Sequence, residues 1–354
     1  MTRIWLRPAS LAALAAGALA AMLPLFPFAV LEASLRGLSI WWEVLFPSLF
    51  PFFVISELLI GFGIVHFLGM LLDPVMRPLF RLPGSAGFVV AMGYISGYPV
   101  SARLTARLRE QELLSRAEGE RIVAFTTTSD PIFLIGAVSV GFFQQPAIAP
   151  LLAAAHYGGS LLVGLAMRLH DRRGPVTPAV RRNGSGRGGR LAAALNAMHE
   201  ARLADGRDIG RLLQDAVRSA LRLMMVVGGL VVFFAVVMEV LARAGVMGLL
   251  QTALGTVLAA AGLPAGFTAP FAAGLFEVTL GARSAAGGGA GLIHQAAAAA
   301  WVLSWAGLSV HAQVASLLSR SGLRYWPFLA ARGLHGLFAF LLVYLLWGWL
   351  GPVR

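Results

Sequence analysis

The sequence contains no cysteine and no lysine, so all 28 of its basic residues are arginine. Without cysteine the chain can form neither a disulfide nor a thiolate metal site, and disulfide chemistry gives no indication of its compartment. Charge is also scarce, because 12% of the 354 residues are charged, against about 25% in a typical soluble domain. Together with a hydrophobic content of 58%, this composition argues against a soluble enzyme.

Long apolar runs dominate the chain, and several exceed the roughly 20 residues that a helix needs to cross a bilayer. We therefore expect an all-α polytopic membrane protein with about seven transmembrane helices. The expected spans are residues 11–31, 41–67, 120–143, 147–169, 212–241, 292–318 and 325–350. The first run is also compatible with a signal peptide, because Ala18-Leu19-Ala20 resembles a cleavage site, but its length favours an uncleaved span.

Two apolar segments break after too few residues to cross a bilayer. We expect re-entrant helical hairpins over residues 84–114, with a tip at Ser96–Ser101, and over residues 264–291, with a tip at Glu277–Arg283. Each is followed by a span that polar residues interrupt, at Thr126–Pro131 and at Ser304–Gln313. Such paired interruptions are the best sequence indication of a transporter's binding site near the bilayer midplane. Two further segments, 71–83 and 246–262, have the composition of helices in the membrane interface.

The positive charge is concentrated between the fourth and fifth spans. Residues 168–222 hold 12 arginines against five acidic residues, which leaves +7 of the total net charge of +12. Because arginine-rich loops remain in the cytoplasm, we place this stretch inside, and we interpret the charge as a topology signal and not as a nucleic-acid site. Within it, residues 174–189 are expected to be a flexible and dispensable linker.

Similar motifs recur in the two halves at nearly one spacing. Ser56–Gly63 matches Met238–Gly245 at an offset of 182 residues, and Ser101–Arg103 matches Gly281–Arg283 at 180. Counting spans from a cytoplasmic N-terminus places the two hairpins on opposite faces, with the C-terminus outside, so an inverted repeat is expected. The expected domains are an N-terminal transmembrane helix (1–37), a first repeat (38–169), a cytoplasmic linker (170–208) and a second, inverted repeat (209–354).

Four motifs carry a resemblance to a known family: LFPSLFPFFVISELLIGFG (45–63), GYISGYPVSARL (93–104), GLFEVTLGA (274–282) and LSWAGLSVHAQVASLL (303–318). They resemble the YlbJ-like sporulation integral membrane proteins of the nucleoside-recognition "gate" superfamily, which is related to concentrative nucleoside transporters. The resemblance covers about residues 41–348 without the arginine-rich loop. It implies transport of a small solute, with dipicolinate the associated substrate, across a bacterial inner membrane (cytoplasmic or forespore). The chain reads FTTTSDP at 125–131, where an Asn-Asn-Ser-Gly-Pro type of break is expected.

Polar residues at the tips and breaks are the candidate solute site, because unwound backbone in a membrane must face protein or a water-filled cavity. The candidates are Ser96, Tyr98, Ser101, Arg103, Thr126, Thr127, Thr128, Ser129, Asp130, Glu277, Thr279, Arg283, Ser304, Ser309, His311 and Gln313. The alternative is that the hydroxyls only satisfy the broken backbone. Arg103 and Arg283 are candidate clamps for a carboxylate, or cations that reach the two interfaces.

Ionisable residues inside apolar segments default to a functional hypothesis. Asp130, Glu277 and His311 are candidates for proton relay, whereas we expect His156, His294 and His335 to make structural hydrogen bonds. We interpret Glu57 and Glu239, which recur before a turn in each half, as helix caps in preference to ion-coupling groups.

The leading functional hypothesis is a secondary transporter or facilitator of a small anionic or heterocyclic metabolite, dipicolinate-like or nucleoside-like, linked to sporulation. The alternatives are a non-transporting membrane scaffold that recruits sporulation partners and, least favoured, an intramembrane enzyme that uses Asp130 with His311. We expect no enzymatic activity and no cofactor, with Na⁺ or H⁺ as possible coupling ions. The expected partners are the solute and the lipid bilayer but no nucleic acid, and homo-oligomerisation is left open.

Overall fold

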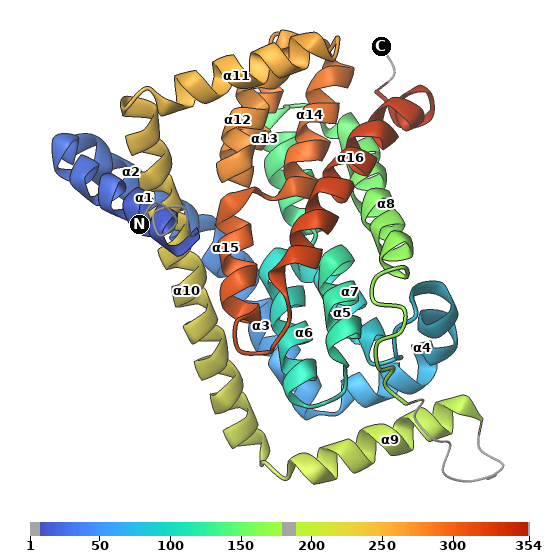
Figure 1. Ribbon diagram of the computed structural model, residues 1–354. Helices are drawn as coiled ribbons and strands as arrows, with labels where there is room; N and C mark the ends of the chain where they lie inside the picture. Colours follow the sequence, from blue (N-terminus) through green and yellow to red (C-terminus); the bar gives the residue numbers. More distant parts are fainter. Residues whose placement is uncertain (1–7, 179–188, 353–354) are drawn as a thin grey trace.

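The computed structural model describes residues 8–178 and 189–352, and every regular element in these ranges is a helix (Figure 1). The all-α fold class is therefore confirmed. The first half contains α1 Pro8–Met22, α2 Pro27–Ser39, α3 Phe46–Gly61, α4 Ile64–Phe80, α5 Ala86–Ser96, α6 Tyr98–Glu110, α7 Arg116–Thr126 and α8 Ala149–Met167. The second contains α9 Arg190–Asp205, α10 Ile209–Arg243, α11 Val246–Ala260, α12 Thr268–Phe276, α13 Val278–Ala286, α14 Leu292–Trp305, α15 Gly307–Leu318 and α16 Tyr325–Leu350. The other elements are the π-helical η2 Ile40–Leu45 and η3 Ile132–Phe142, with the 3₁₀ turns η1 Leu23–Leu25, η4 Pro146–Ile148 and η5 Ala265–Phe267.

Four helical segments are long and apolar enough to cross a membrane, and two bent helix pairs would raise the number to six. The four are Pro146–Met167, Ile209–Arg243, Leu292–Leu318 and Tyr325–Leu350. They coincide with four of the expected spans to within a few residues. The chain is therefore a multi-pass membrane protein.

The N-terminal region differs from expectation. Residues 11–31 do not form one straight span, because the helix axis turns by 108° between Ala16–Leu25 and Pro27–Glu43. Two prolines, Pro24 and Pro27, stand at this turn, where their missing N–H groups prevent a continuous helix. The second expected span, 41–67, also has different ends. Its helical residues run without interruption from Pro27 to Gly61 and then turn by 83° into α4.

The segment expected to be a linker, 170–208, contains a helix. The run of strong helix formers in α9 explains it, and α9 packs against α4 so closely that a Cβ at Gly63 would lie 2.5 Å from the Met198 carbonyl oxygen. Gly63 fits here because it has no Cβ, and its φ of +80° is a second reason for glycine at this position. Asp208 then caps α10 by accepting a hydrogen bond from the Arg211 N–H.

The start of this segment is not a free linker either. The Thr177 N–H and Oγ1 donate to Glu118 at 3.0 and 2.5 Å, and Arg77 donates to the Thr177 carbonyl at 3.0 Å. The expectation that 174–189 is flexible throughout is therefore wrong for residues 174–178, while residues 179–188 lie outside the described ranges.

The two halves contain the same elements in the same order. The continuous helix from Pro27 to Gly61 is followed by α4, the hairpin α5–α6, the broken pair α7–η3 and the long helix α8. In the second half, α10 is followed by α11, the hairpin α12–α13, the broken pair α14–α15 and α16. In Figure 1, α4 lies at one end of the molecule and α11 crosses the opposite end.

Small residues let the long helices approach each other. All five alanines of 296–300 in α14 are at most 1% exposed, and this helix packs against α16, which in turn packs against α8. Close packing of small side chains is the usual basis of helix association in membranes, where no hydrophobic effect drives it. This core supports the break between α14 and α15.

Candidate functional site

A cavity of about 520 Å³ lies where the hairpin turns meet the broken helices. Its walls are mostly apolar, and they come from η2, η3 and α10 as well as from the hairpins. The side chains with polar groups on its surface are Glu43, Tyr98, Asp130, Glu277, Thr279, Ser309 and Gln313. No basic side chain lines it among the described residues.

Four helices begin at this cavity. The lining residues nearest their N-termini are Tyr98 and Pro99 of α6, Ile132 and Phe133 of η3, Val278 and Thr279 of α13, and Ser309 and Val310 of α15. The first N–H groups of a helix have no partner within it, and they carry the positive end of the helix dipole. Convergent N-termini therefore suit a ligand with anionic or hydrogen-bond-accepting groups.

Carboxylates cap two of these four N-termini. Asp130 accepts a hydrogen bond from the Phe133 N–H at 2.8 Å, and Glu277 accepts one from the Leu280 N–H at 2.7 Å. The other two helices have no side-chain cap, since Gly97 precedes α6 and Ala306 precedes α15. The N-terminus of α15 and that of α6, in which Pro99 contributes no N–H, are therefore not capped by a side chain.

Each hairpin turn touches the break of the helix that follows it. A Cβ at Gly97 would lie 3.2 Å from Asp130 Oδ2, and one at Gly307 would lie 2.9 Å from the backbone nitrogen of Glu277. Both glycines have positive φ, +84° and +73°, which other residues rarely adopt. Glycine is therefore required on both sides of the cavity.

A fully buried polar layer connects the two breaks. His156 of α8 accepts from the Ser129 N–H through Nε2 at 2.9 Å, and its Nδ1 lies 2.9 Å from Ser304 Oγ. The Tyr98 hydroxyl donates to the Leu303 carbonyl at 2.7 Å, which joins the first hairpin to the second broken helix. The hydroxyls of Thr126 and Thr127 instead donate to carbonyls one turn earlier in α7.

Arg332 of α16 is the other residue that holds both breaks. Its side chain is fully buried, and its guanidinium donates to the carbonyls of Ala124 and Thr127 in the first break and of Ser304 in the second, the last at 3.2 Å. These carbonyls lie where α7 and α14 end, at the negative poles of their dipoles.

The sixteen residues proposed from the sequence fall into three groups. Six line the cavity: Tyr98, Asp130, Glu277, Thr279, Ser309 and Gln313. Seven are buried residues of the breaks and hairpin that do not line it: Ser96, Ser101, Thr126, Thr127, Thr128, Ser129 and Ser304. The other three do not line the cavity either: Arg103 and Arg283 lie past the hairpin tips, and His311 is buried beside the second break.

The structure places neither proposed arginine clamp on the cavity. Arg103 pairs with Glu57 and also donates to the Ser219 hydroxyl and carbonyl, whereas Arg283 is exposed. Arg103 stands five residues after Tyr98, more than one helical turn beyond the tip, so α6 carries it away from the cavity. His311 is held by the Tyr325 hydroxyl at 2.6 Å and the Trp305 carbonyl at 3.0 Å.

Two other expectations are resolved by these contacts. Glu57 and Glu239 are not helix caps, because Glu57 pairs with Arg103, and Glu239 pairs with Arg36 at 2.8 Å and Arg243 at 3.0 Å. The expectation of structural histidines is confirmed: besides His156, His335 lies 2.7 Å from the His156 carbonyl and His294 lies 2.7 Å from the Tyr344 hydroxyl.

Sequence reasoning missed Glu43 and Arg332. Both are ionisable residues inside apolar runs, which is itself a functional signal. Glu43 lies on the π-helical η2 and faces the cavity, and π-helical turns are frequent at functional sites. Within the described ranges, no group of three or more His, Asp or Glu residues is arranged to hold a metal ion.

Broken helices and hairpin turns around a shared cavity define a multi-pass helical membrane protein with the architecture of a transporter-like fold. A family model described as "Gate: Nucleoside recognition" matches residues 42–169. The chain is 46% identical over 321 residues to the sporulation integral membrane protein YlbJ of Bacillus subtilis, which covers 91% of this chain and 78% of that protein. The chain therefore belongs to the YlbJ family of sporulation integral membrane proteins.

A more distant relative is an uncharacterized protein of Alkalihalophilus pseudofirmus. It is 28% identical over 154 residues, which covers 40% of this chain and 33% of the relative. No solved structure matches the chain significantly.

Proposed function

We propose that this protein is a secondary transporter or facilitator of a small metabolite in sporulation, and that the cavity between the hairpin turns is its solute site. The observation that carries this proposal is the convergence of four helix N-termini on one cavity of about 520 Å³. Its volume falls in the range of about 300–1,000 Å³ that is usual for small-molecule sites. A scaffold without a solute would not need two polar breaks that meet the hairpin turns at glycines of positive φ.

The cavity favours a flat heterocycle that carries carboxylate or other acceptor groups. Apolar walls from Ile40, Leu45, Val227 and Val231 suit the ring, and the uncapped N-termini of α6 and α15 suit its acceptors. A dipicolinate-like solute fits these features first, and a nucleoside-like solute second. Backbone N–H groups, in place of arginine side chains, are the proposed recognition elements.

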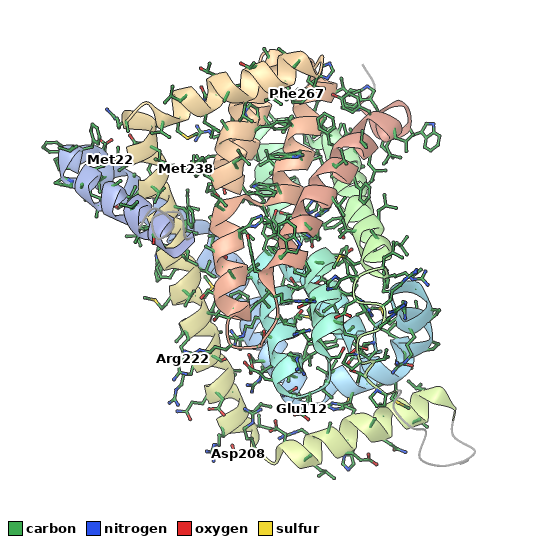
Figure 2. The ribbon with its side chains drawn as sticks, viewed as in Figure 1. Met22, Glu112, Asp208, Arg222, Met238 and Phe267 are labelled. Atoms are coloured by element: carbon green, nitrogen blue, oxygen red, sulfur yellow. The ribbon has the colours of Figure 1, made fainter. Side chains whose placement is uncertain are left out.

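For the membrane arrangement we propose seven spans and two re-entrant hairpins that enter from opposite faces, in a bacterial inner membrane of the cell or forespore. The similar element order of 38–169 and 209–354 supports an inverted repeat. Figure 2 places Glu112 and Asp208 at one end of the molecule and Phe267 at the other. The end with Asp208 adjoins the arginine-rich stretch, so we assign it to the cytoplasm.

Single cysteines in this cysteine-free chain test the arrangement. Arg320→Cys, in the turn between α15 and α16, and Ala261→Cys, at the end of α11, are both exposed. We expect an impermeant maleimide to label Ala261→Cys from outside and Arg320→Cys only after permeabilisation. Labelling of both from one side would contradict the inverted repeat.

The positions of the ionisable groups support a function without catalysis. The intramembrane-enzyme alternative pairs Asp130 with His311, but only Asp130 lines the cavity. We propose no cofactor, and the lipid bilayer and the solute as the partners.

Uptake into proteoliposomes tests the transport proposal. Wild-type protein should take up dipicolinate faster than uridine, and both faster than protein-free liposomes. Gly136→Leu should abolish uptake, because Gly136 lines the cavity and a Cβ there meets no atom within 4 Å, so the added side chain fills the cavity without a backbone clash. Gly333→Leu is the matched control, because its Cβ position is equally open and lies outside the cavity. Wild-type protein that moves neither solute would favour the scaffold.

A further inference from the structure

Among the arginines of the described ranges, Arg332 is distinguished by donating to both broken helices. Arg121 is also buried, without an ion pair, and donates to three backbone carbonyls. The Arg332 side chain is 0% exposed, and it takes part in none of the ion pairs found among the described residues. Its acceptors are three backbone carbonyls, those of Ala124, Thr127 and Ser304. A buried charge is expensive unless oriented dipoles stabilise it, and here two helix ends supply them.

These carbonyls belong to the C-terminal ends of two half-helices, because α7 ends at Thr126 and α14 ends at Trp305. The last carbonyls of a helix have no partner within it and carry the negative end of the dipole. In transporters with broken helices, such unwound carbonyls and half-helix C-termini are where a coupling Na⁺ is coordinated.

We propose that the Arg332 guanidinium is a tethered cation that occupies the place of a mobile Na⁺, so that solute movement through the cavity does not require Na⁺. The claim that solute movement does not require Na⁺ rests on the proposed transport function. The claim that the guanidinium occupies the carbonyl oxygens does not depend on that function. The guanidinium uses the carbonyl oxygens that a metal ion would need, and its charge repels a second cation.

The neighbouring side chains complete the argument. The Thr126 and Thr127 hydroxyls donate to Ile122 and Val123, and the His156 ring is held between the two breaks, so these groups are already in use. The hydroxyls of Thr128 and Ser129 are buried and have no hydrogen-bond partner. If the guanidinium were removed, these two hydroxyls and the three released carbonyls would form an oxygen-rich set of the kind that Na⁺ binds.

The equivalent position of the first half does not repeat the charge. The spacing of 177 residues that aligns Pro150–Ala154 with Pro327–Ala331 places Ala155 opposite Arg332. The next residue, His156, reaches both breaks but contacts an N–H and a hydroxyl instead of carbonyls. One tethered cation therefore serves both half-helix ends.

The first test compares Na⁺ with K⁺ and choline at equal ionic strength on wild-type protein. Both the thermal midpoint of unfolding in detergent and the initial rate of dipicolinate uptake should be the same in the three salts. A higher midpoint or a several-fold faster uptake in Na⁺ alone would overturn the proposal. The midpoint requires no transport, so it remains decisive if dipicolinate proves not to be moved.

The second test removes the guanidinium. Arg332→Ala should have a lower midpoint than wild-type protein, and Na⁺, but not K⁺ or choline, should raise it by roughly 3 °C when its concentration is about ten times the dissociation constant. Arg320→Ala, in the exposed turn that precedes the same helix, should show no Na⁺-specific shift. A folded Arg332→Ala protein without such a shift would contradict the proposal.

If Arg332→Ala does not fold, Arg332→Lys keeps a charge but cannot reproduce the fork of hydrogen bonds. It should be less stable than wild-type protein and still insensitive to Na⁺. A Na⁺-specific rise of the midpoint of Arg332→Lys would show that Na⁺ binds even though a tethered cation is present, which would contradict the proposal.

Discussion

The two halves of the molecule hold their broken helices with side chains of different chemistry. In α8 a neutral imidazole, His156, accepts from an N–H of one break and contacts a hydroxyl of the other. In α16 a guanidinium, Arg332, donates to the carbonyls of both. The two halves therefore repeat the same helices without repeating the charged side chain. On our proposal, the charge in the second half alone makes the shared site independent of Na⁺.

The hairpin turns differ in the same way. The first turn is a glycine, Gly97, which leaves the N-terminus of α6 uncapped, whereas Glu277 stands at the second turn and caps α13. The roles at the breaks are reversed, because Asp130 caps η3 while Ala306, which lacks a polar side chain, precedes α15. Each half therefore contributes one capped and one open N-terminus to the cavity.

The largest expected effect concerns a buried acid that only the first half possesses. Glu120 of α7 is 0% exposed; it accepts from the Arg324 side chain at 2.7 and 2.8 Å and lies 2.7 Å from His170, while an offset of 180 residues places Ala300 at the equivalent position. Glu120→Gln should reduce the free energy of unfolding by about 3 kcal/mol, because a buried pair loses one charge. Thermal unfolding in detergent measures this. Glu110→Gln, whose pair with Arg107 is exposed, should cost less than about 1 kcal/mol, and equal losses would contradict the asymmetry.

The two glycines of positive φ beside the cavity, Gly97 at the first hairpin turn and Gly307 at the second break, should rank next. Gly307→Ala places a Cβ 2.9 Å from backbone atoms of Phe276 and Glu277, whereas Gly97→Ala meets mainly the Asp130 side chain at 3.2 Å. Each substitution costs about 1–3 kcal/mol from the positive φ alone, and Gly307→Ala should be the more destabilising because backbone cannot move aside. Gly333→Ala, at an open helical position, is the control. A smaller loss for Gly307→Ala than for Gly97→Ala would refute this ranking.

A smaller effect is expected from the hydroxyl that joins the first hairpin to the second broken helix. Tyr98→Phe removes the hydrogen bond to the Leu303 carbonyl and should cost about 1–2 kcal/mol, since it leaves a buried acceptor unsatisfied. Val278, at the equivalent place in the second hairpin, has no hydroxyl, so Val278→Thr adds a polar group without a waiting partner. If Tyr98→Phe left the thermal midpoint unchanged, this link between the halves would carry no stability.

The smallest effect lies outside the repeats, at the corner between α9 and α10. Two hydrogen bonds from the Arg207 guanidinium, at 2.8 and 2.7 Å, lower the pKa of Asp205. Because the pKa of Asp205 is lower in the folded protein, the contact stabilises this corner fully at pH values above the ordinary aspartate pKa of about 3.9. This stabilisation is lost as the pH falls through the pKa of the folded state. The protection factors of the α9 amides, which correct for the intrinsic pH dependence of exchange, should therefore fall in acid for wild-type protein, whereas Asp205→Asn should have lower protection factors already at neutral pH. Identical pH profiles of the two proteins would contradict this assignment.

The sequence predicts the long elements well because their apolar runs are sufficient evidence. Residues 325–350 were expected as one span and form α16 with the same ends, and the first hairpin turns at Gly97, within its expected tip. The sequence is a weaker guide to where prolines bend a helix. The apolar run 11–31 is long enough to span a membrane, but the chain turns by 108° between α1 and α2 at Pro24 and Pro27. The helix α9 was missed because its arginine-rich surroundings suggested a linker.

The sequence predicts six of the residues that line the cavity, including Asp130 and Glu277, but not the places of the arginines. Matching positions of Arg103 and Arg283 indicate a repeated fold, and nothing in that match shows which way each side chain points. Arg332 was missed because its acceptors at Ala124 and Thr127 are more than 200 residues away in the chain. Long-range backbone contacts of this kind leave no local pattern in the sequence.

The most direct test of the solute site uses thiol modification of single cysteines. Thr279 lines the cavity, and Thr256 is exposed on α11 away from it. In proteoliposomes, a small methanethiosulfonate should block dipicolinate uptake by the Thr279→Cys protein, and dipicolinate should slow the modification, while Thr256→Cys protein stays active and unprotected. Full uptake by modified Thr279→Cys protein would contradict the claim that solute passes between the two hairpin turns.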